Sequence, residues 1–215
     1  MLFKGRRDVA ERLAARLAAF RGRHPLVLGL PRGGVPMARI IADALGGEVD
    51  VVLVRKLRAP GQPELAIGAV DESGAVLKGP LFGTASPSYV QAEIRAQLET
   101  LRHRRALYTR AHPSIDPAGR TVIVVDDGVA TGASMEAAVR ALRARGPEAI
   151  VVAVGVAPPA SVRNLQAVAD DVLCLDSPAD FQAVGQFFDD FTQVSDAEVT
   201  AALSRPGSPD GAVQR

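Results

Sequence analysis

The segment Thr121–Val125 constrains the fold more than any other part of this 215-residue chain. It is a run of β-branched residues, which favour strands, and two aspartates, Asp126 and Asp127, follow it at once. A continuous apolar run of this kind is typical of a strand buried on both faces, as in a parallel sheet covered by helices. We therefore expect two adjacent carboxylates at the carboxyl edge of a sheet, where α/β proteins bind their ligands.

Apolar runs alternate with amphipathic stretches along the chain, and this alternation predicts an α/β domain with a mostly parallel sheet. The other expected parallel strands are 26–30, 49–54, 149–154 and 171–175. The expected helices are 6–21, 34–45, 89–109, 132–145 and 161–169. The segment 57–64 is predicted to be a loop because it contains two prolines and a glycine, whereas 65–78 fits a hairpin that turns at 71–74.

The carboxyl-terminal part of the chain differs in composition from the rest. Residues 164–204 contain no lysine or arginine, but seven aspartates, Glu198 and four of the seven phenylalanines. This predicts a separate acidic lobe with its own small aromatic cluster, including a short helical piece at 183–191. A last helix is expected after the capping box 195–198, and the proline- and glycine-containing tail 204–215 is expected to be flexible.

Composition excludes several classes of protein. The chain has 25 Lys and Arg residues and 24 Asp and Glu residues, so its overall charge does not attract nucleic acid or anionic lipid. Its single cysteine, Cys174, excludes an internal disulfide and a multi-cysteine metal site. The longest weakly polar stretch, 149–160, is too short to span a membrane, and the arginine-rich N-terminus is a poor signal peptide. The default expectation is a soluble cytoplasmic protein.

The seven residues after the two aspartates are small or hydroxylated, apart from Val129, and they lead into a helix. A loop of this composition can turn its N–H groups inward, and the helix that follows adds the positive end of its dipole. Thr131 and Ser134 contribute hydroxyl donors. The sequence therefore predicts a cradle for a phosphate beside carboxylates for hydroxyl groups and Mg²⁺, which together suit a sugar phosphate.

The segment 122–134 closely resembles the phosphoribosyl-pyrophosphate (PRPP) motif of type I phosphoribosyltransferases. The resemblance implies the fold of that family, with a mostly parallel five-stranded central sheet flanked by helices and a small C-terminal hood. It also implies that Asp126 and Asp127 hold the ribose hydroxyls, with Mg²⁺ bound through PRPP nearby. The 5′-phosphate would then be bound by Gly128, Val129, Ala130, Thr131, Gly132, Ala133 and Ser134.

Two further segments fit the same resemblance. The run Leu30–Pro36 looks like the pyrophosphate loop of xanthine–guanine phosphoribosyltransferases, which implies that Arg32, Gly33 and Gly34 contact pyrophosphate. Lys56 begins a segment, about 56–68, that corresponds to the mobile lid of the family. As one of three lysines against 22 arginines, Lys56 is a candidate catalytic residue, although a snorkelling lysine at a strand end has the same pattern.

The chain also departs from its purine-specific relatives. Where they carry an aspartate that handles the proton on the base, this sequence has Ala130. Either no general base is needed there, or another group such as Glu64 serves. In the hood, Phe181 is the candidate for stacking on a base, whereas the spacing of Phe187 and Phe191 favours a role in packing.

The expected organisation is a phosphoribosyltransferase core at 1–175, a hood at 176–203 and the tail. The expected activity is Mg²⁺-dependent transfer of the phosphoribosyl group of PRPP to a nitrogen nucleophile, such as a nucleobase, by a homodimer of the kind common in the family. The alternative is a regulator of the same fold that senses PRPP or a nucleotide and binds RNA through the basic segment 89–110, which holds five arginines and two glutamates. A phosphate-ester hydrolase is a weaker alternative, because no nucleophile motif supports it.

Overall fold

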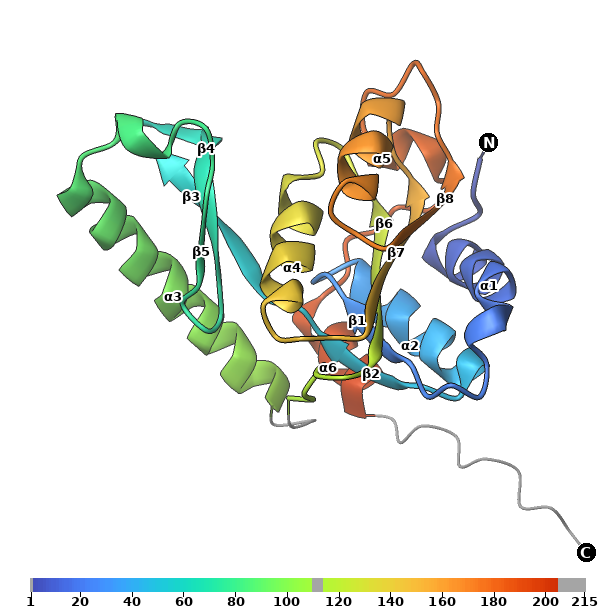
Figure 1. Cartoon of the computed structure of the whole chain (residues 1–215). Coiled ribbons are helices and arrows are strands. Elements are labelled where there is room, and N and C mark those ends of the chain that lie inside the picture. The colour runs from blue at the N-terminus through green and yellow to red at the C-terminus, as the bar shows by residue number, and fades with distance from the viewer. Residues whose placement is uncertain (1, 110–113, 205–215) are drawn as a thin grey trace, which may run out of the picture.

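A five-stranded parallel sheet forms the centre of the molecule (Figure 1). The computed structural model describes residues 2–109 and 114–204. The strand order is β2-β1-β6-β7-β8, and every neighbouring pair is parallel. The strands are β1 (Leu26–Gly29), β2 (Glu48–Val51), β6 (Thr121–Gly128), β7 (Ala149–Val156) and β8 (Asp171–Asp176). The predicted parallel sheet is confirmed, and each strand lies within a few residues of its expected position.

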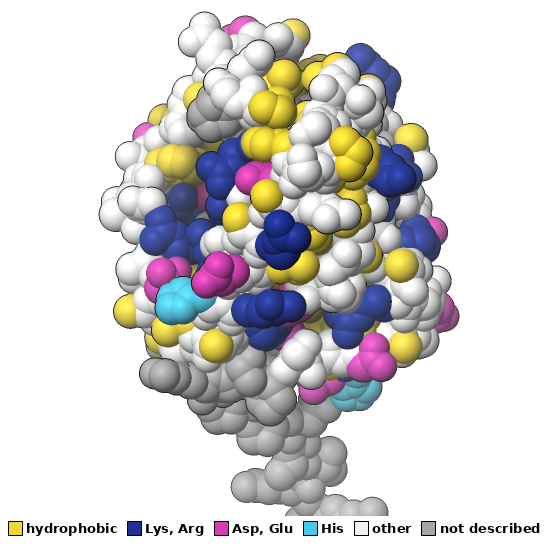
Figure 2. Space-filling view, turned by 90° about the vertical axis from the view of Figure 1, so that its left-hand side faces the viewer, with side chains coloured by type: hydrophobic (Ala, Val, Ile, Leu, Met, Phe, Trp, Pro, Cys, Tyr) yellow, Lys and Arg dark blue, Asp and Glu magenta, His cyan; other side chains and the backbone are white. Residues whose placement is uncertain are grey.

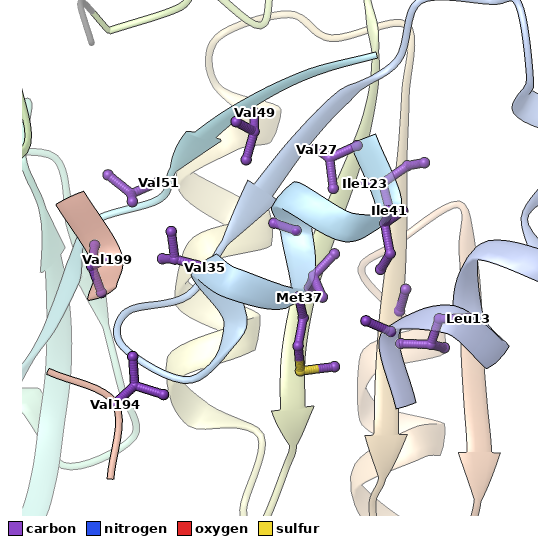
Figure 3. Close-up of a cluster of buried hydrophobic side chains, with 14 of the residues drawn as sticks. Leu13, Val27, Val35, Met37, Ile41, Val49, Val51, Ile123, Val194 and Val199 are labelled. Atoms are coloured by element: carbon purple, nitrogen blue, oxygen red, sulfur yellow. The ribbon is translucent and has the colours of Figure 1, made fainter. Parts of the chain in front are cut away.

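Helices cover both faces of this sheet because successive side chains of each strand point to opposite faces. One face packs against α1 (Arg6–Arg16) and α2 (Gly34–Leu45), as the side chains in Figure 3 show. The opposite face packs against α4 (Ala133–Arg143) and α5 (Pro159–Gln166). In β6 the alternation is regular: Ile123 and Val125 face α1 and α2, whereas Val122 and Val124 face α4 and α5.

A second, antiparallel sheet lies beside α4 and carries the long helix α3 (Pro87–Thr109) (Figure 1). Its strands are β3 (Val54–Ala59), β4 (Gln62–Asp71) and β5 (Val76–Lys78), and a short 3-10 turn, η2 (Phe82–Thr84), precedes α3. The loop predicted at 57–64 is therefore wrong, because β3 and β4 form a hairpin through this segment. Ala59 pairs with Gln62, so Pro60 and Gly61 are the whole turn, and Gly61 has a φ of 69°.

The carboxyl-terminal residues close over the amino-terminal segment. They include η3 (Val184–Phe187) and α6 (Asp196–Ser204), and the predicted capping box is confirmed by hydrogen bonds in both directions between Ser195 and Glu198. The expected helical piece at 183–191 is limited to η3. The expected tail, 204–215, lies outside the described residues from position 205 onward.

The four phenylalanines of the hood pair with one another, Phe181 with Phe187 and Phe188 with Phe191, and Phe3 from the amino terminus joins them, which the composition did not predict. Phe3 pairs with Phe188 in an isolated β-bridge, and their ring centroids lie 5.4 Å apart. Phe187 and Phe188 belong to the same buried cluster as α1 and α2. The amino terminus therefore completes the packing of the hood. The first helix is also shorter than expected, because it ends at Arg16 and a 3-10 turn, η1 (Ala18–Phe20), follows it.

Candidate functional site

A cleft of about 480 Å³ opens at the carboxyl edge of the central sheet. The inner wall comes from the segments that follow β1 and β2 and from the tip of β6. The cleft therefore lies at the carboxyl ends of β1 and β6, which are neighbours at the centre of the sheet, and this is where open α/β sheets bind their ligands. The outer wall comes from β3 and α3. The lining residues are Leu30, Pro31, Leu53, Val54, Arg55, Lys56, Arg58, Leu101, Arg104, Asp126 and Ser134.

Asp126 is the carboxylate that faces this cleft. Burial at the tip of β6 raises its pKa well above the ordinary value, and the neighbouring charge of Asp127 raises it further. One of its oxygens accepts a hydrogen bond of 2.9 Å from the backbone N–H of Asp127. No cation pairs with Asp126 within the described ranges, so its carboxylate is available to hydroxyl donors or to a bound cation.

Asp127 points to a different neighbour, Arg6 on α1. Its Oδ2 accepts a hydrogen bond of 2.7 Å from Nε of Arg6, and both side chains are largely buried. Burial raises the pKa of Asp127, and the Arg6 guanidinium opposes that rise. Arg6 also donates to the carbonyl oxygen of Thr192 at 2.6 Å and lies 4.2 Å from the centroid of the Phe191 ring. Arg6 therefore links the second acid to the hood.

The loop after β6 has the donors that a phosphate requires. None of the backbone N–H groups from Ala130 to Met135 donates to another group in the described part of the chain, and they lie at the start of α4. Gly132 adopts a φ of 83°, which favours glycine and lets the loop enter the helix. The Ser161 hydroxyl on α5 donates to the Ala130 carbonyl at 2.6 Å and so holds the loop from behind.

The loop after β1 lies directly against the two acids. The peptide bond between Pro31 and Arg32 is cis. A Cβ atom at Gly33 would collide with Oδ2 of Asp127, and one at Gly34 would collide with the Val125 carbonyl oxygen. Glycine is therefore required at both positions, because these atoms approach the backbone too closely to leave room for a side chain. Arg32 makes no hydrogen bond or ion pair within residues 2–109 and 114–204.

The outer wall of the cleft is strongly basic. Arg55, Lys56 and Arg58 come from β3, and Arg104 comes from α3. Against these four cations, Asp126 is the one acidic residue in the lining set. Lys56 is exposed and also borders a neighbouring cavity beside Ala133, at the start of α4. The cleft is therefore suited to a ligand with several negative charges.

Of the predicted site residues, Lys56, Asp126 and Ser134 line the cleft, whereas Arg32 is not among its lining residues and Gly33 lies against Asp127. Phe181 does not line the cleft; its ring stacks on Phe187 with centroids 5.6 Å apart. Ala130 is exposed, and the side chain of Glu64 lies outside the described residues. The predicted packing role fits Phe187, which is buried, better than Phe191, whose side chain is 38% exposed.

Sequence reasoning missed five contributors to this site: Arg6, Arg58, Arg104, Gly155 and Ser161. Arg6 is 121 residues away from Asp127 in the chain, and no local pattern marks it. Gly155 leaves room for the Asp127 carbonyl oxygen, which a Cβ atom would approach to 2.6 Å. A glycine inside the otherwise apolar run 149–156 was the one available signal, because such glycines mark close approach of another backbone.

The donor set fits Mg²⁺ only together with a ligand. No group of three acidic, histidine or cysteine side chains suited to a metal occurs in the part of the chain that the structure describes. Asp127 is already paired with Arg6, which leaves Asp126 as the open carboxylate. Mg²⁺ is often held by one or two carboxylates plus substrate phosphates, and this arrangement matches that pattern.

Comparisons with known proteins agree with the fold. The family described as "Phosphoribosyl transferase domain" matches residues 4–191. The protein named "Putative phosphoribosyl transferase Rv0571c" of Mycobacterium tuberculosis H37Rv is 44% identical over 210 residues, which are 95% of this chain and 47% of that protein. The crystal structure of TT1426 from Thermus thermophilus has a TM-score of 0.86 and 48% identity, and the match covers 95% of this chain and 98% of that one.

This chain belongs to the phosphoribosyltransferase family. It spans about half the length of the curated relatives that it matches. Among the described residues, no helix has the length and apolar character that a membrane span would need.

Proposed function

We propose that this protein transfers the 5-phosphoribosyl group of PRPP to a nitrogen nucleophile, for which a nucleobase is the first candidate, and releases diphosphate. The observation that carries the proposal is the free row of amides from Ala130 to Met135, which follows Asp126 along the chain; Asp126 and Ser134 line a cleft that has a basic wall. Amides at a helix start bind a terminal phosphate, and a carboxylate accepts hydrogen bonds from ribose hydroxyls.

In this arrangement the 5′-phosphate would occupy the amide cradle and the ribose would lie on Asp126. The diphosphate would extend toward Arg32 and the basic wall. The bond between C1 of the ribose and the diphosphate oxygen breaks, and its electron pair leaves with the diphosphate, while the lone pair of the attacking nitrogen forms a bond to C1 and the nitrogen releases its proton to water. Bound Mg²⁺ would neutralise the negative charge that develops on the leaving diphosphate. Arg32 and the wall cations would stabilise the same charge.

Isothermal titration with PRPP and Mg²⁺, followed by a screen of nucleobases and amines for PRPP-dependent diphosphate release, tests this proposal. We expect binding to the wild type and a loss of at least about tenfold in affinity for Asp126→Asn, because one charged hydrogen-bond acceptor is removed. No binding at millimolar PRPP, or equal affinity in the variant, would refute the PRPP site.

The same screen separates an enzyme from a regulator. PRPP binding without diphosphate release from any acceptor, together with RNA binding, would favour the regulator. The helix α3 gives that alternative little support, because Arg105 is held by Asp50 and Glu72 and Arg104 lines the cleft. Figure 2 shows that Lys and Arg side chains on this face are interspersed with acidic and hydrophobic ones, not gathered in one continuous patch.

A further inference from the structure

Two polar side chains on α3, Glu93 and Gln97, hold the outer wall of the cleft from behind. The amide oxygen of Gln97 accepts a hydrogen bond of 2.9 Å from Nε of Arg55, and its nitrogen donates one of 2.9 Å to Oε1 of Glu93. The same Glu93 oxygen accepts bonds of 3.1 and 3.2 Å from the backbone nitrogen and Nε of Arg58. A continuous chain of hydrogen bonds therefore joins Arg55 to Arg58 through α3.

The position of Gln97 is unusual for an amide. Gln97 is 1% exposed and lies where α3 packs on β3. An apolar side chain could occupy the same position. A buried amide lowers stability unless its polar atoms are hydrogen-bonded. Here the oxygen and the nitrogen each hold a charged partner, so the amide fixes the orientation of both neighbours.

The charges on this wall are not balanced by the protein. Burial lowers the pKa of Arg55, and the nearby charges of Arg104 and Arg58 lower it further, while Glu93 opposes the shift. Glu93 is the one carboxylate that bonds to these arginines among the described residues. The wall therefore keeps a positive excess facing the cleft, which an anionic ligand would neutralise.

We propose that Glu93 and Gln97 are positioning residues that aim the guanidinium groups of Arg55 and Arg58 at the diphosphate end of the substrate. This inference rests on the proposed function and extends it to a specific pair of arginines and their support. A neutral amide at 97 links Arg55 to Glu93 without adding a second carboxylate, so the wall keeps its positive charge. The two positioning residues act through the arginines and do not touch the ligand themselves.

The test is calorimetric binding of two probes, inorganic diphosphate with Mg²⁺ and ribose 5-phosphate, to the full chain. Gln97→Met keeps the size and removes both hydrogen bonds, and Gln91→Met is the matched control at an exposed position of the same helix. We expect Gln97→Met to bind diphosphate about tenfold more weakly, because a hydrogen bond to a charged group is lost. Its affinity for ribose 5-phosphate, which the cradle binds, and all affinities of Gln91→Met should match the wild type.

Each other outcome contradicts a defined part of the inference. Wild-type diphosphate affinity in a folded Gln97→Met variant would overturn the positioning role but leave the proposed function intact. Loss of both probes in that variant would show a general structural defect and also overturn the positioning role. If the wild type binds neither probe, the proposed function itself fails. Should Gln97→Met not fold, Gln97→Leu, which also removes both hydrogen bonds and leaves the charge of the wall unchanged, must show the same selective loss of diphosphate binding.

Discussion

Replacing Gly155 by alanine tests whether the acid pair depends on close backbone packing behind it. A Cβ atom at this position would lie 2.6 Å from the Asp127 carbonyl oxygen and 2.8 Å from Cγ1 of Val9. Ordinary contact begins at 3.4 Å, so β6 and β7 must separate by about 0.8 Å. Val9 is fully buried on α1.

The added methyl group should affect both stability and ligand binding. Overpacking of this kind costs about 1–3 kcal/mol in the free energy of unfolding, and each kcal/mol lowers the Tm of a chain of this size by about 2–4 °C. A displacement approaching 1 Å at reacting groups can lower the efficiency of an enzyme by up to about 100-fold. We therefore expect the affinity of Gly155→Ala for PRPP to fall by about 10- to 100-fold.

Titration calorimetry with PRPP and Mg²⁺, together with thermal unfolding, measures both effects. Gly83→Ala is the matched control, because a Cβ atom at Gly83 has nothing within 4 Å. A folded Gly155→Ala protein with wild-type PRPP affinity would refute the reasoning, as would an equal loss in Gly83→Ala.

Three other variants test the site from different sides. Burial raises the pKa of Asp126, so the folded state holds its proton more tightly than the unfolded chain and stability falls as pH rises above about 3.8. Asp126→Asn should therefore raise Tm at neutral pH and flatten its dependence on pH while PRPP binding is lost; a lower Tm at pH 7.5 would contradict this. Arg6→Met should cost about 2–4 kcal/mol in urea unfolding because it leaves the Asp127 carboxylate without its cation. Adding Asp127→Asn should recover part of that loss, and strict additivity of the two changes would count against the ion pair. Ser161→Ala should cost about 1 kcal/mol and weaken ribose 5-phosphate binding, since the Ala130 carbonyl loses its donor; unchanged affinity would show that the loop holds its shape without this bond.

The central sheet could be predicted from sequence because its signals are local. Runs of β-branched residues end at turn residues, and amphipathic stretches separate them, so the strands at 121–128 and 149–156 were found within a few residues of their ends. The hairpin of β3 and β4 was missed because Pro60 and Gly61, taken as signs of a loop, form its two-residue turn. Pro63 is compatible with β4 because β5 pairs only with residues 68–70 of that strand.

The candidate site was predictable only where its residues are consecutive. Residues 126–134 and 30–34 carry local patterns, and the structure places them around one edge of the sheet. The partners that come from distant parts of the chain have no such pattern. Arg6, Arg58 and Arg104 reach the site through tertiary packing, which periodicity does not encode, whereas Lys56 was predicted from the resemblance and lines the cleft. The contribution of Phe3 to the aromatic cluster of the hood could not be predicted for the same reason, because Phe3 comes from a distant part of the chain.

The contact of Arg6 with Asp127 and Thr192 bears on how this domain is made. Arg6 is synthesised before its two partners, which follow it in the chain by 121 and 186 residues. Closing contacts over such separations is entropically costly and tends to come late in folding. A nascent chain in which Thr192 has not yet left the ribosome would therefore lack the contact that joins Arg6 and Asp127 to the hood, so ligand capture during translation would report that this part of the hood has emerged.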